Sequence, residues 1–473
     1  MSFNSFSFLF FFLPVVTLGY FLIGDRAGGR WRKIWLLAAS LTFVAVASVR
    51  DVSLLLCSLA VNCMIGRLLL RPQEGLRISR GTLFVGGLLA NILFLCYYKY
   101  SSFFLQLVAP GISHNWARPS FPLGISFYTI YQIMFLVDCY EGLVDHHNWL
   151  DHFVFAGLFS YVTMGPIVRW KLVVPQLNGP NASVLNADNV ARGLFLFVCG
   201  LFKKAVLADS FFRWADAGFS WQHPLSMLGG WLAAFAFTFE LYFDFSGYTD
   251  MALGVALMLN LNLPQNFNSP FRAQSIIDFW RRWHITLTNF ITTYLYTPMI
   301  RAFPRPTFGA ALAATFLAMV IAGFWHGPDW TFLIFGALHG GALVINQCWK
   351  KMKLPMPPSL GGLLTFTFVV LSLVFFRSPT ASHAVDMLRS MFTLHGGFFN
   401  YEPWNGIDHV DQVLGITWMS IAVGIVFWAP NSMELERTFR PSWRMVALTV
   451  TMAVIACIYV NGVVSRSFVY RDF

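Results

Sequence analysis

One histidine stands where its surroundings favour chemistry. His326 closes a long apolar run and is followed directly by Gly327 and Pro328. A Gly-Pro pair does not continue a regular helix without cost, and a helix broken in an apolar environment leaves backbone groups that must face protein or a water-filled cavity. We therefore expect the imidazole of His326 to line a cavity. A neutral imidazole there can act as a general base toward a hydroxyl group.

Other polar residues gather between positions 240 and 340, amid apolar runs. Ionisable groups are costly at membrane depth, so such a concentration is a hypothesis of function. A lone histidine is more often a packing residue bonded to a carbonyl, and this polar pattern is what favours the catalytic interpretation of His326. The candidates for supporting roles are His284, His339, Asp244, Asp250, Asp278, Arg281, Arg282 and Trp325.

The two further histidines have different contexts. His339 comes thirteen residues after His326. If one helix joined them, they would lie about 20 Å apart along its axis, which would exclude a direct dyad. We expect His339 to support the site or to be structural. His284 follows Arg281-Arg282-Trp283, which is typical of a helix at the membrane interface whose cations contact headgroups or an anionic substrate.

The acidic residues of this region favour structural roles. Asp244 and Asp250 flank a Ser-Gly-Tyr sequence that we expect to break a helix. Buried carboxylates usually need partners, so these should orient a histidine or pair with an arginine. His147 and Asp151 have a spacing that would share a helix face, but spacing alone is weak evidence for a metal. We expect no metal and no permanently bound cofactor.

The composition indicates that the segments carrying these residues are surrounded by lipid. The chain is 57% hydrophobic and 11% charged, whereas soluble domains carry about 25% charged residues. Its formal charge of +10 is concentrated in short basic clusters at 26–33 and 67–80, between apolar runs. This pattern follows the positive-inside rule and argues against nucleic acid as a partner. It places the N-terminus outside, both clusters in the cytoplasm, and the loop with His114 and Arg118 outside.

Apolar runs near the length of a spanning helix recur along the whole chain. Because a spanning helix needs about 20 apolar residues, we expect an all-α polytopic membrane protein with about 11 to 13 membrane segments. We expect one domain over 1–473, with a motif-rich core at 121–345 and C-terminal helices at 360–463. The runs fall at 3–23, 34–49, 52–66, 82–108, 121–140, 152–168, 190–208, 226–243, 308–326, 330–348, 360–376, 412–429 and 443–463.

Several stretches resemble the membrane-bound O-acyltransferases, in the bacterial branch typified by the alginate O-acetylation membrane protein and the D-alanyl transfer protein of teichoic acid synthesis. The resemblance covers about 1–350. The stretches that carry it are Phe121-Pro-Leu-Gly-Ile-Ser-Phe-Tyr-Thr, Met164-Gly-Pro-Ile-Val-Arg, Tyr242-Phe-Asp-Phe-Ser-Gly-Tyr-Thr-Asp-Met, Phe279-Trp-Arg-Arg-Trp-His-Ile-Thr-Leu, Tyr294-Leu-Tyr-Thr-Pro, Phe324-Trp-His-Gly-Pro and Gly336-Ala-Leu-His-Gly.

The resemblance implies both a fold and an activity. The fold is a ring of tilted helices around a thin centre that is pierced by a tunnel. His326 matches the family's catalytic histidine, and His284 matches its second characteristic histidine. The activity is O-acyl transfer, in which an acyl group from a cytoplasmic donor such as acetyl-CoA crosses the bacterial inner membrane. A periplasmic partner protein then passes acetyl to an exopolysaccharide such as alginate or cellulose.

Two alternatives remain open at this point. One is a transporter or flippase for an acyl donor or lipid-linked sugar, without covalent chemistry; the lack of an internal repeat argues against it. The other keeps the enzyme but changes the acceptor to a lipid or a protein. In either case we expect membrane lipids to surround the chain.

Overall fold

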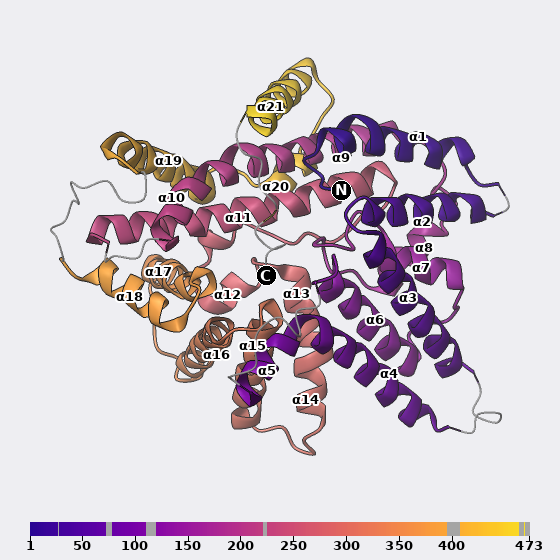
Figure 1. Ribbon diagram of the computed structural model, residues 1–473, viewed down its shortest axis with the longest axis horizontal. Coiled ribbons are helices and arrows are strands. Elements are labelled where there is room, and N and C mark those ends of the chain that lie inside the picture. Colours follow the sequence, from indigo (N-terminus) through magenta and orange to yellow (C-terminus); the bar gives the residue numbers. More distant parts are fainter. Residues whose placement is uncertain are drawn as a thin grey trace. The chain divides into compact units, whose positions relative to one another are not determined.

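The fold is helical throughout the part of the chain that is described. The computed structural model describes residues 1–26, 28–71, 78–109, 120–220, 225–394, 407–462 and 468. These form helices joined by turns, without a β-sheet among them (Figure 1). The predicted all-α membrane fold is confirmed. The loop with His114 and Arg118 lies outside the described residues.

Seven helices within the described ranges are long and apolar enough to cross a membrane. A shorter apolar helix covers Phe8–Ile23. The expected total of about 11 to 13 segments also includes shorter and more polar helices, and it stays a prediction, as does the tunnel. The seven are Val49–Leu69, Arg80–Val108, Phe308–His326, Trp330–Lys351, Pro358–Arg377, Val410–Trp428 and Trp443–Asn461.

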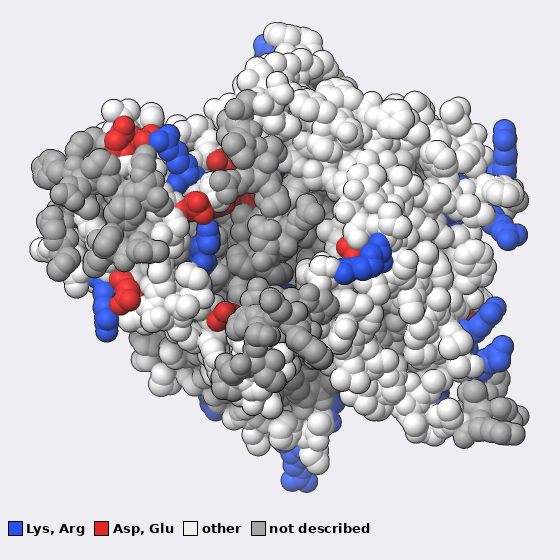
Figure 2. Space-filling view, in the orientation of Figure 1, with Lys and Arg blue, Asp and Glu red and all other residues white. Residues whose placement is uncertain are grey.

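The exposed side chains are those expected of a protein surrounded mainly by lipid. Charged side chains are sparse on the face shown in Figure 2 and are separated by wide uncharged areas. Many large apolar side chains are exposed, for example Phe11 and Leu22, which are 71% and 77% accessible. A soluble protein seldom exposes apolar surface on this scale.

The chain packs into two compact units that alternate along the sequence. Unit 1 comprises Met1–Cys199, Tyr248–Pro264 and Pro441–Thr449, and unit 2 comprises Gly200–Gly247, Gln265–Arg440 and Val450–Phe473. The single domain expected over 1–473 stays a prediction.

Unit 1 is built around neighbouring apolar helices. α3, α4 and α6 pack on one another and lie side by side in Figure 1. Asn62 on α3 and Asn91 on α4 exchange amide hydrogen bonds of 3.1 and 2.6 Å, which join two apolar helices by buried polar groups. The helices are η1 (Phe8–Phe12), α1 (Leu13–Ile23), α2 (Arg30–Ala45), α3 (Val49–Leu69), α4 (Arg80–Leu95), η3 (Cys96–Tyr100), α5 (Ser101–Val108), α6 (Ile125–Tyr140), α7 (Trp149–Gly157), α8 (Trp170–Leu177), most of α9 (Ala187–Phe202), the last part of α11 (Met227–Met258) and the start of α21 (Trp443–Gly462).

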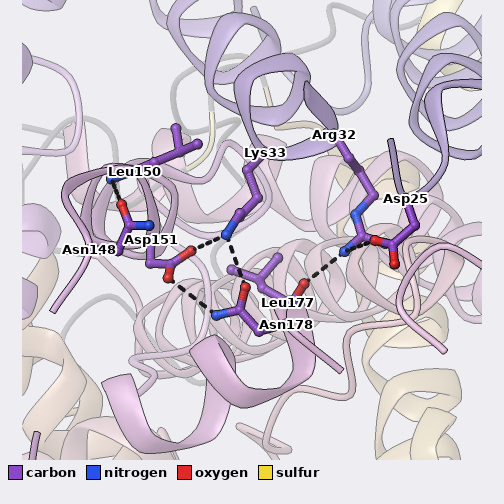
Figure 3. Close-up of polar contacts among 8 residues, drawn as sticks. All are labelled: Asp25, Arg32, Lys33, Asn148, Leu150, Asp151, Leu177 and Asn178. Atoms are coloured by element: carbon purple, nitrogen blue, oxygen red, sulfur yellow. Dashed lines mark hydrogen bonds and ion pairs between the residues drawn. The ribbon is translucent and has the colours of Figure 1, made fainter. Parts of the chain in front are cut away.

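A buried polar network ties three helices of unit 1 together (Figure 3). The ammonium of Lys33 on α2 donates to Asp151 on α7 at 2.7 Å and to Asn178, the residue after α8, at 3.0 Å. Asn178 also donates to Asp151, at 3.2 Å. Arg32 donates to the carbonyl of Leu177 at 2.8 Å. The first basic cluster therefore does more than face headgroups, because two of its members are buried structural ties.

The run predicted at 152–168 is helical only as far as Gly157. The following residues form buried turns instead of a spanning helix. Side chains supply the hydrogen bonds that a helix would have made: Ser40 accepts from the amide of Phe159, and the Tyr131 hydroxyl donates to the carbonyl of Pro166. An apolar run thus stays buried without helical backbone, which the hydropathy pattern alone did not reveal.

Unit 2 contains the polar region singled out in the sequence. Its helices are η5 (Lys203–Ala208), α10 (Asp209–Ser220), the first part of α11 (Met227–Met258), η6 (Pro270–Arg272), α12 (Ile276–Trp280), α13 (Ile285–Phe290), η7 (Ile291–Tyr296), α14 (Thr297–Arg301), α15 (Phe308–His326), α16 (Trp330–Lys351), α17 (Pro358–Arg377), α18 (Ala381–Phe392), α19 (His409–Trp428), α20 (Ser432–Arg437) and the end of α21 (Trp443–Gly462).

α11 corrects a prediction. The Ser-Gly-Tyr sequence between Asp244 and Asp250 does not break a helix, because α11 runs through it without interruption. Gly247 meets a packing need instead: a Cβ there would lie 2.7 Å from the carbonyl oxygen of Gly200. Glycine is needed at position 247 because two backbones approach each other closely there. This tertiary packing outweighs the low helix propensity of glycine.

Candidate active site

The candidate site begins where α15 and α16 meet. The two helices pack closely and antiparallel, with Gly323 of α15 against Gly336 of α16. α15 ends at His326, and Gly327 is extended, with φ −165° and ψ 154°. A Cβ on Gly327 would lie 2.1 Å from the ring of Phe332, so only glycine fits this turn. The predicted end of the helix at Gly327-Pro328 is confirmed.

His326 is buried in an aromatic setting. Its ring lies edge-to-face with Trp325 at 5.0 Å and with Phe376 at 5.2 Å, measured between ring centroids. It lines a cavity of about 10 Å³, which is roughly the space of one water molecule. Leu241, Trp280, Phe335 and His339 also line this cavity. A small apolar chamber of this kind lowers the local dielectric and strengthens electrostatic effects on any group within it.

His339 lines the same cavity as His326, so the condition under which one helix would separate the two histidines does not hold. The intervening segment is not one helix, because the chain reverses at Gly327–Asp329. Both imidazoles pack against Phe335, at centroid distances of 6.4 Å for His326 and 4.4 Å for His339. The indole N–H of Trp280 donates to Nδ1 of His339 at 3.2 Å, and Nε2 lies 2.9 Å from the Ser372 hydroxyl.

These two hydrogen bonds determine which ring nitrogen of His339 carries the proton. Nδ1 accepts from an indole, which is only a donor, so the proton of the neutral ring is on Nε2. The Ser372 hydroxyl donates its own hydrogen to the carbonyl of Val369 at 2.9 Å and thus accepts from His339. With both nitrogens engaged, the imidazole of His339 is fixed in the cavity wall, and a supporting role in the chemistry stays a prediction.

His284 is fully buried at the start of α13 and has a left-handed backbone, with φ 43°. Its Nδ1 lies 3.1 Å from Oδ1 of Asn266, which also accepts from the amide and the hydroxyl of Thr286, at 3.1 and 2.9 Å. The Thr286 amide identifies that Asn266 atom as the oxygen, so His284 Nδ1 must donate to it. Burial lowers the pKa of His284 to about 3, so the ring is neutral and its Nε2 carries the lone pair.

The Nε2 atom of His284 and the Nδ2 atom of Asn266 are both buried, without a hydrogen-bond partner among the described residues. The ring packs edge-to-face on Phe245 at 4.7 Å. His284 does not line the cavity of His326, although its neighbour Trp283 does. Sequence reasoning did not single out Asn266; its signal was an amide in the polar Leu-Pro-Gln-Asn-Phe-Asn stretch.

The residues before His284 do not form the predicted interface helix. α12 ends at Trp280, and 281–284 are turns. Arg282 pairs with Asp278 at 2.9 Å, and Asp278 also accepts from the amide of Gln274 at 3.2 Å. Arg281 is exposed. Asp278 and Arg282 therefore stabilise the chain around α12, and a role for Arg281 in binding stays a prediction.

Asp244 pairs with a lysine, whereas a histidine or an arginine was expected from the sequence. Lys204 lies 2.7 Å from both Asp244 and Asp209, and all three side chains are buried. Glu240 is buried one helical turn before Asp244. Sequence reasoning missed Lys204, although a single lysine pair within the apolar run 190–208 was a usable signal. Asp250 is buried and belongs to unit 1.

The described residues contain no group of three His, Cys, Asp or Glu side chains arranged to hold a metal ion. His147 precedes α7, so it does not share a helix face with Asp151, and Asp151 is bound to Lys33. The cavity itself presents the imidazole of His326 in apolar surroundings, and the imidazole of His339 also lines it.

The comparisons with known proteins define the class. The model of the membrane-bound O-acyltransferase family matches residues 88–358. The chain belongs to this family and is a multi-pass membrane O-acyltransferase. Membership in a family of enzymes favours the acyltransferase over the transport alternative.

Individual relatives extend the match over the whole chain. A protein named peptidoglycan O-acetyltransferase from Helicobacter pylori is 34% identical over 100% of this chain and 98% of its own length. A probable alginate O-acetylase, AlgI, from Pseudomonas aeruginosa is 36% identical over 83% of this chain and 75% of its own. A teichoic acid D-alanyltransferase from Bacillus subtilis is 25% identical over 65% of this chain and 80% of its own.

Proposed function

We propose that the chain transfers acetyl groups across the bacterial inner membrane for the O-acetylation of a secreted exopolysaccharide such as alginate or cellulose. The donor is a cytoplasmic thioester such as acetyl-CoA, and a periplasmic partner protein completes delivery to the glycan. The observation that carries this proposal is His326, which lies at the broken end of α15 on a water-sized cavity that His339 helps to wall.

In the proposed reaction, His326 acts as the general base. It removes the proton from an acceptor hydroxyl as the oxygen attacks the thioester carbonyl. The new C–O bond forms, the C–S bond breaks, and the thiolate that leaves takes up the proton from the imidazolium. We favour direct transfer because no activated nucleophile stands beside His326 in the described cavity wall. General-base catalysis typically contributes about 10² to 10⁴ in rate.

His326→Ala tests this role. We expect glycan O-acetylation to fall by about 10² or more while the protein still inserts and purifies as the wild type does. The matched control is His146→Ala, which removes an exposed histidine of unit 1. The readout is ester-linked acetate released from isolated glycan, measured by mass spectrometry. Unchanged acetate in His326→Ala would refute the catalytic assignment.

A second candidate acceptor is peptidoglycan. It is favoured by one observation: the peptidoglycan O-acetyltransferase relative aligns over the whole chain, while the alginate relative covers 83% of it. Deleting the gene and measuring acetate separately in muropeptides and in secreted polysaccharide distinguishes the two. Loss from lipid or protein fractions alone would instead indicate the lipid or protein acceptor.

A further inference from the structure

A large groove lies between α16 and α17 in unit 2 and is distinct from the small cavity of His326. Its volume is about 860 Å³. Ala337, Gly341, Ile345 and Lys350 line it from α16, and Leu364 and Phe368 line it from α17. Ala337, Gly341 and Ile345 recur every four positions and so lie on one side of α16, while Lys350 lies near the end of the helix. From Ala337 to Lys350 the helix is about 20 Å long.

The two ends of the groove differ in chemistry. Lys350, Asn346 and Gln274 line one end, where α16 finishes with Lys350 and Lys351 in its last turn. The other end is formed by Ala337 and Phe368, which are apolar. The groove therefore suits an amphiphile with an anionic head and an apolar tail.

The sides of the groove are open to the surroundings of the two helices. Ile345 and Leu364 line it and are 67% and 53% exposed. Both α16 and α17 are candidate membrane spans, so apolar side chains exposed on them face lipid. An occupant can reach the groove sideways from the bilayer.

The apolar end of the groove adjoins the candidate active site. The ring of Phe368 lies edge-to-face with His339 at a centroid distance of 5.0 Å. His339 in turn shares the small cavity with His326. One aromatic ring thus separates an occupant of the groove from the residue that walls the catalytic chamber.

We propose that this groove binds one membrane phospholipid, with its phosphate at Lys350 and an acyl chain along α16 toward Phe368. The hydrocarbon of one leaflet is about 15 Å deep, half of a core of about 30 Å, and the groove accommodates that length. The ammonium of Lys350 at the polar end complements a phosphate. The apolar inner end has few hydrogen-bonding groups, so it suits hydrocarbon better than the amide-bearing arm of a thioester donor. The lipid supports Phe368 and, through it, His339.

Gly341→Leu tests the site with little risk to folding. A Cβ at Gly341 would have no neighbouring atom within 4 Å, and Gly341 lines the groove, so we expect a leucine there to occupy groove space. Gly424→Leu on α19 is the matched control, because a Cβ there is equally free. Native mass spectrometry of the full chain, extracted in mild detergent, measures the phospholipid that stays bound. We expect wild type and Gly424→Leu to retain one phospholipid that Gly341→Leu loses.

A second variant tests the headgroup contact without touching the packing. Lys350 is exposed, so Lys350→Gln should leave the fold intact. We expect about fivefold weaker retention of phosphatidylglycerol, as for the loss of one basic residue from an anionic lipid surface, and no change with Lys353→Gln. Addition of free inorganic phosphate should not displace the lipid.

Three results would overturn the proposal. One is equal lipid retention by Gly341→Leu and wild type. Another is displacement of the bound molecule by inorganic phosphate alone. The third is a groove that retains coenzyme A thioester and no phospholipid, which would make it a donor site. None of these results bears on whether His326 is the base, which His326→Ala tests separately.

Discussion

At the residue scale, the two supporting histidines differ in the nitrogen that each leaves available. Trp280 and Ser372 occupy both nitrogens of His339, which makes that ring a fixed wall. Asn266 occupies only Nδ1 of His284, so the basic Nε2 is unengaged among the described residues. Asn266 therefore acts on His284 as a positioning residue that selects its tautomer, in the way that outer partners orient imidazoles at other sites.

Asn266→Asp puts this positioning role to a pH test. A carboxylate beside Nδ1 favours the imidazolium, so we expect the pKa of His284 to rise from its present value of about 3. If acetyl transfer needs the neutral imidazole of His284, the rate of the variant should decline as pH falls from 8 to about 5, because His284 then becomes protonated. The wild type should show no decline from this group in that range. A pH profile of initial rates measures the difference.

Asn268→Asp is the control in the same loop, since Asn268 bonds to Asn431 and not to a histidine. It should leave the pH profile of the wild type unchanged. Two profiles of the same shape for Asn266→Asp and wild type would contradict a role for the tautomer of His284.

At the scale of elements, the α15–α16 pair determines where both cavity histidines lie. The backbones approach so closely that a Cβ on Gly336 would lie 2.6 Å from the carbonyl oxygen of Met319. Small residues permit such contacts between membrane helices. The pair is therefore the element on which the site geometry depends most directly.

Gly336→Ala should separate the two helices and distort the cavity. We expect destabilisation of about 1 to 3 kcal/mol, as for overpacking in a close-packed core, together with a loss of acetyl transfer. Gly341→Ala on the same helix is the control, because its added methyl group meets no atom within 4 Å. Thermal unfolding in detergent and the rate of acetyl transfer are the measurements. If both variants unfold at the same temperature, close packing at Gly336 is not important.

Sequence patterns predicted the elements well where a local signal decides, either hydropathy or a Gly-Pro pair. The end of α15 at His326 followed from Gly327-Pro328, and the long apolar helices were located within a few residues. The break expected in α11 failed because the need for Gly247 comes from Gly200, which is distant in the sequence. The cavity shared by His326 and His339 could not be predicted for the same reason, because it depends on the reversal of the chain between them. The role of Asn266 likewise depends on its tertiary contact with His284.

At the scale of the whole molecule, a sparse set of charges must set the orientation of many apolar helices. Not all of the basic residues remain available for headgroups, because Lys33 is paired with Asp151 inside unit 1. Arg26 and Arg30 in the same cluster are exposed. The positive-inside rule applied to the exposed residues still predicts that residues 24–33 are in the cytoplasm and the N-terminus is outside.

Single cysteines at exposed positions test this orientation. In a variant whose 7 native cysteines are replaced, Arg26→Cys should resist a membrane-impermeant maleimide added to spheroplasts and react only after lysis. Ser120→Cys, exposed and just after the loop expected outside, should react in intact spheroplasts. The paired positions control for reagent access, because each should give the opposite result. Labelling of Arg26→Cys before lysis would invert the assigned topology of this part of the chain.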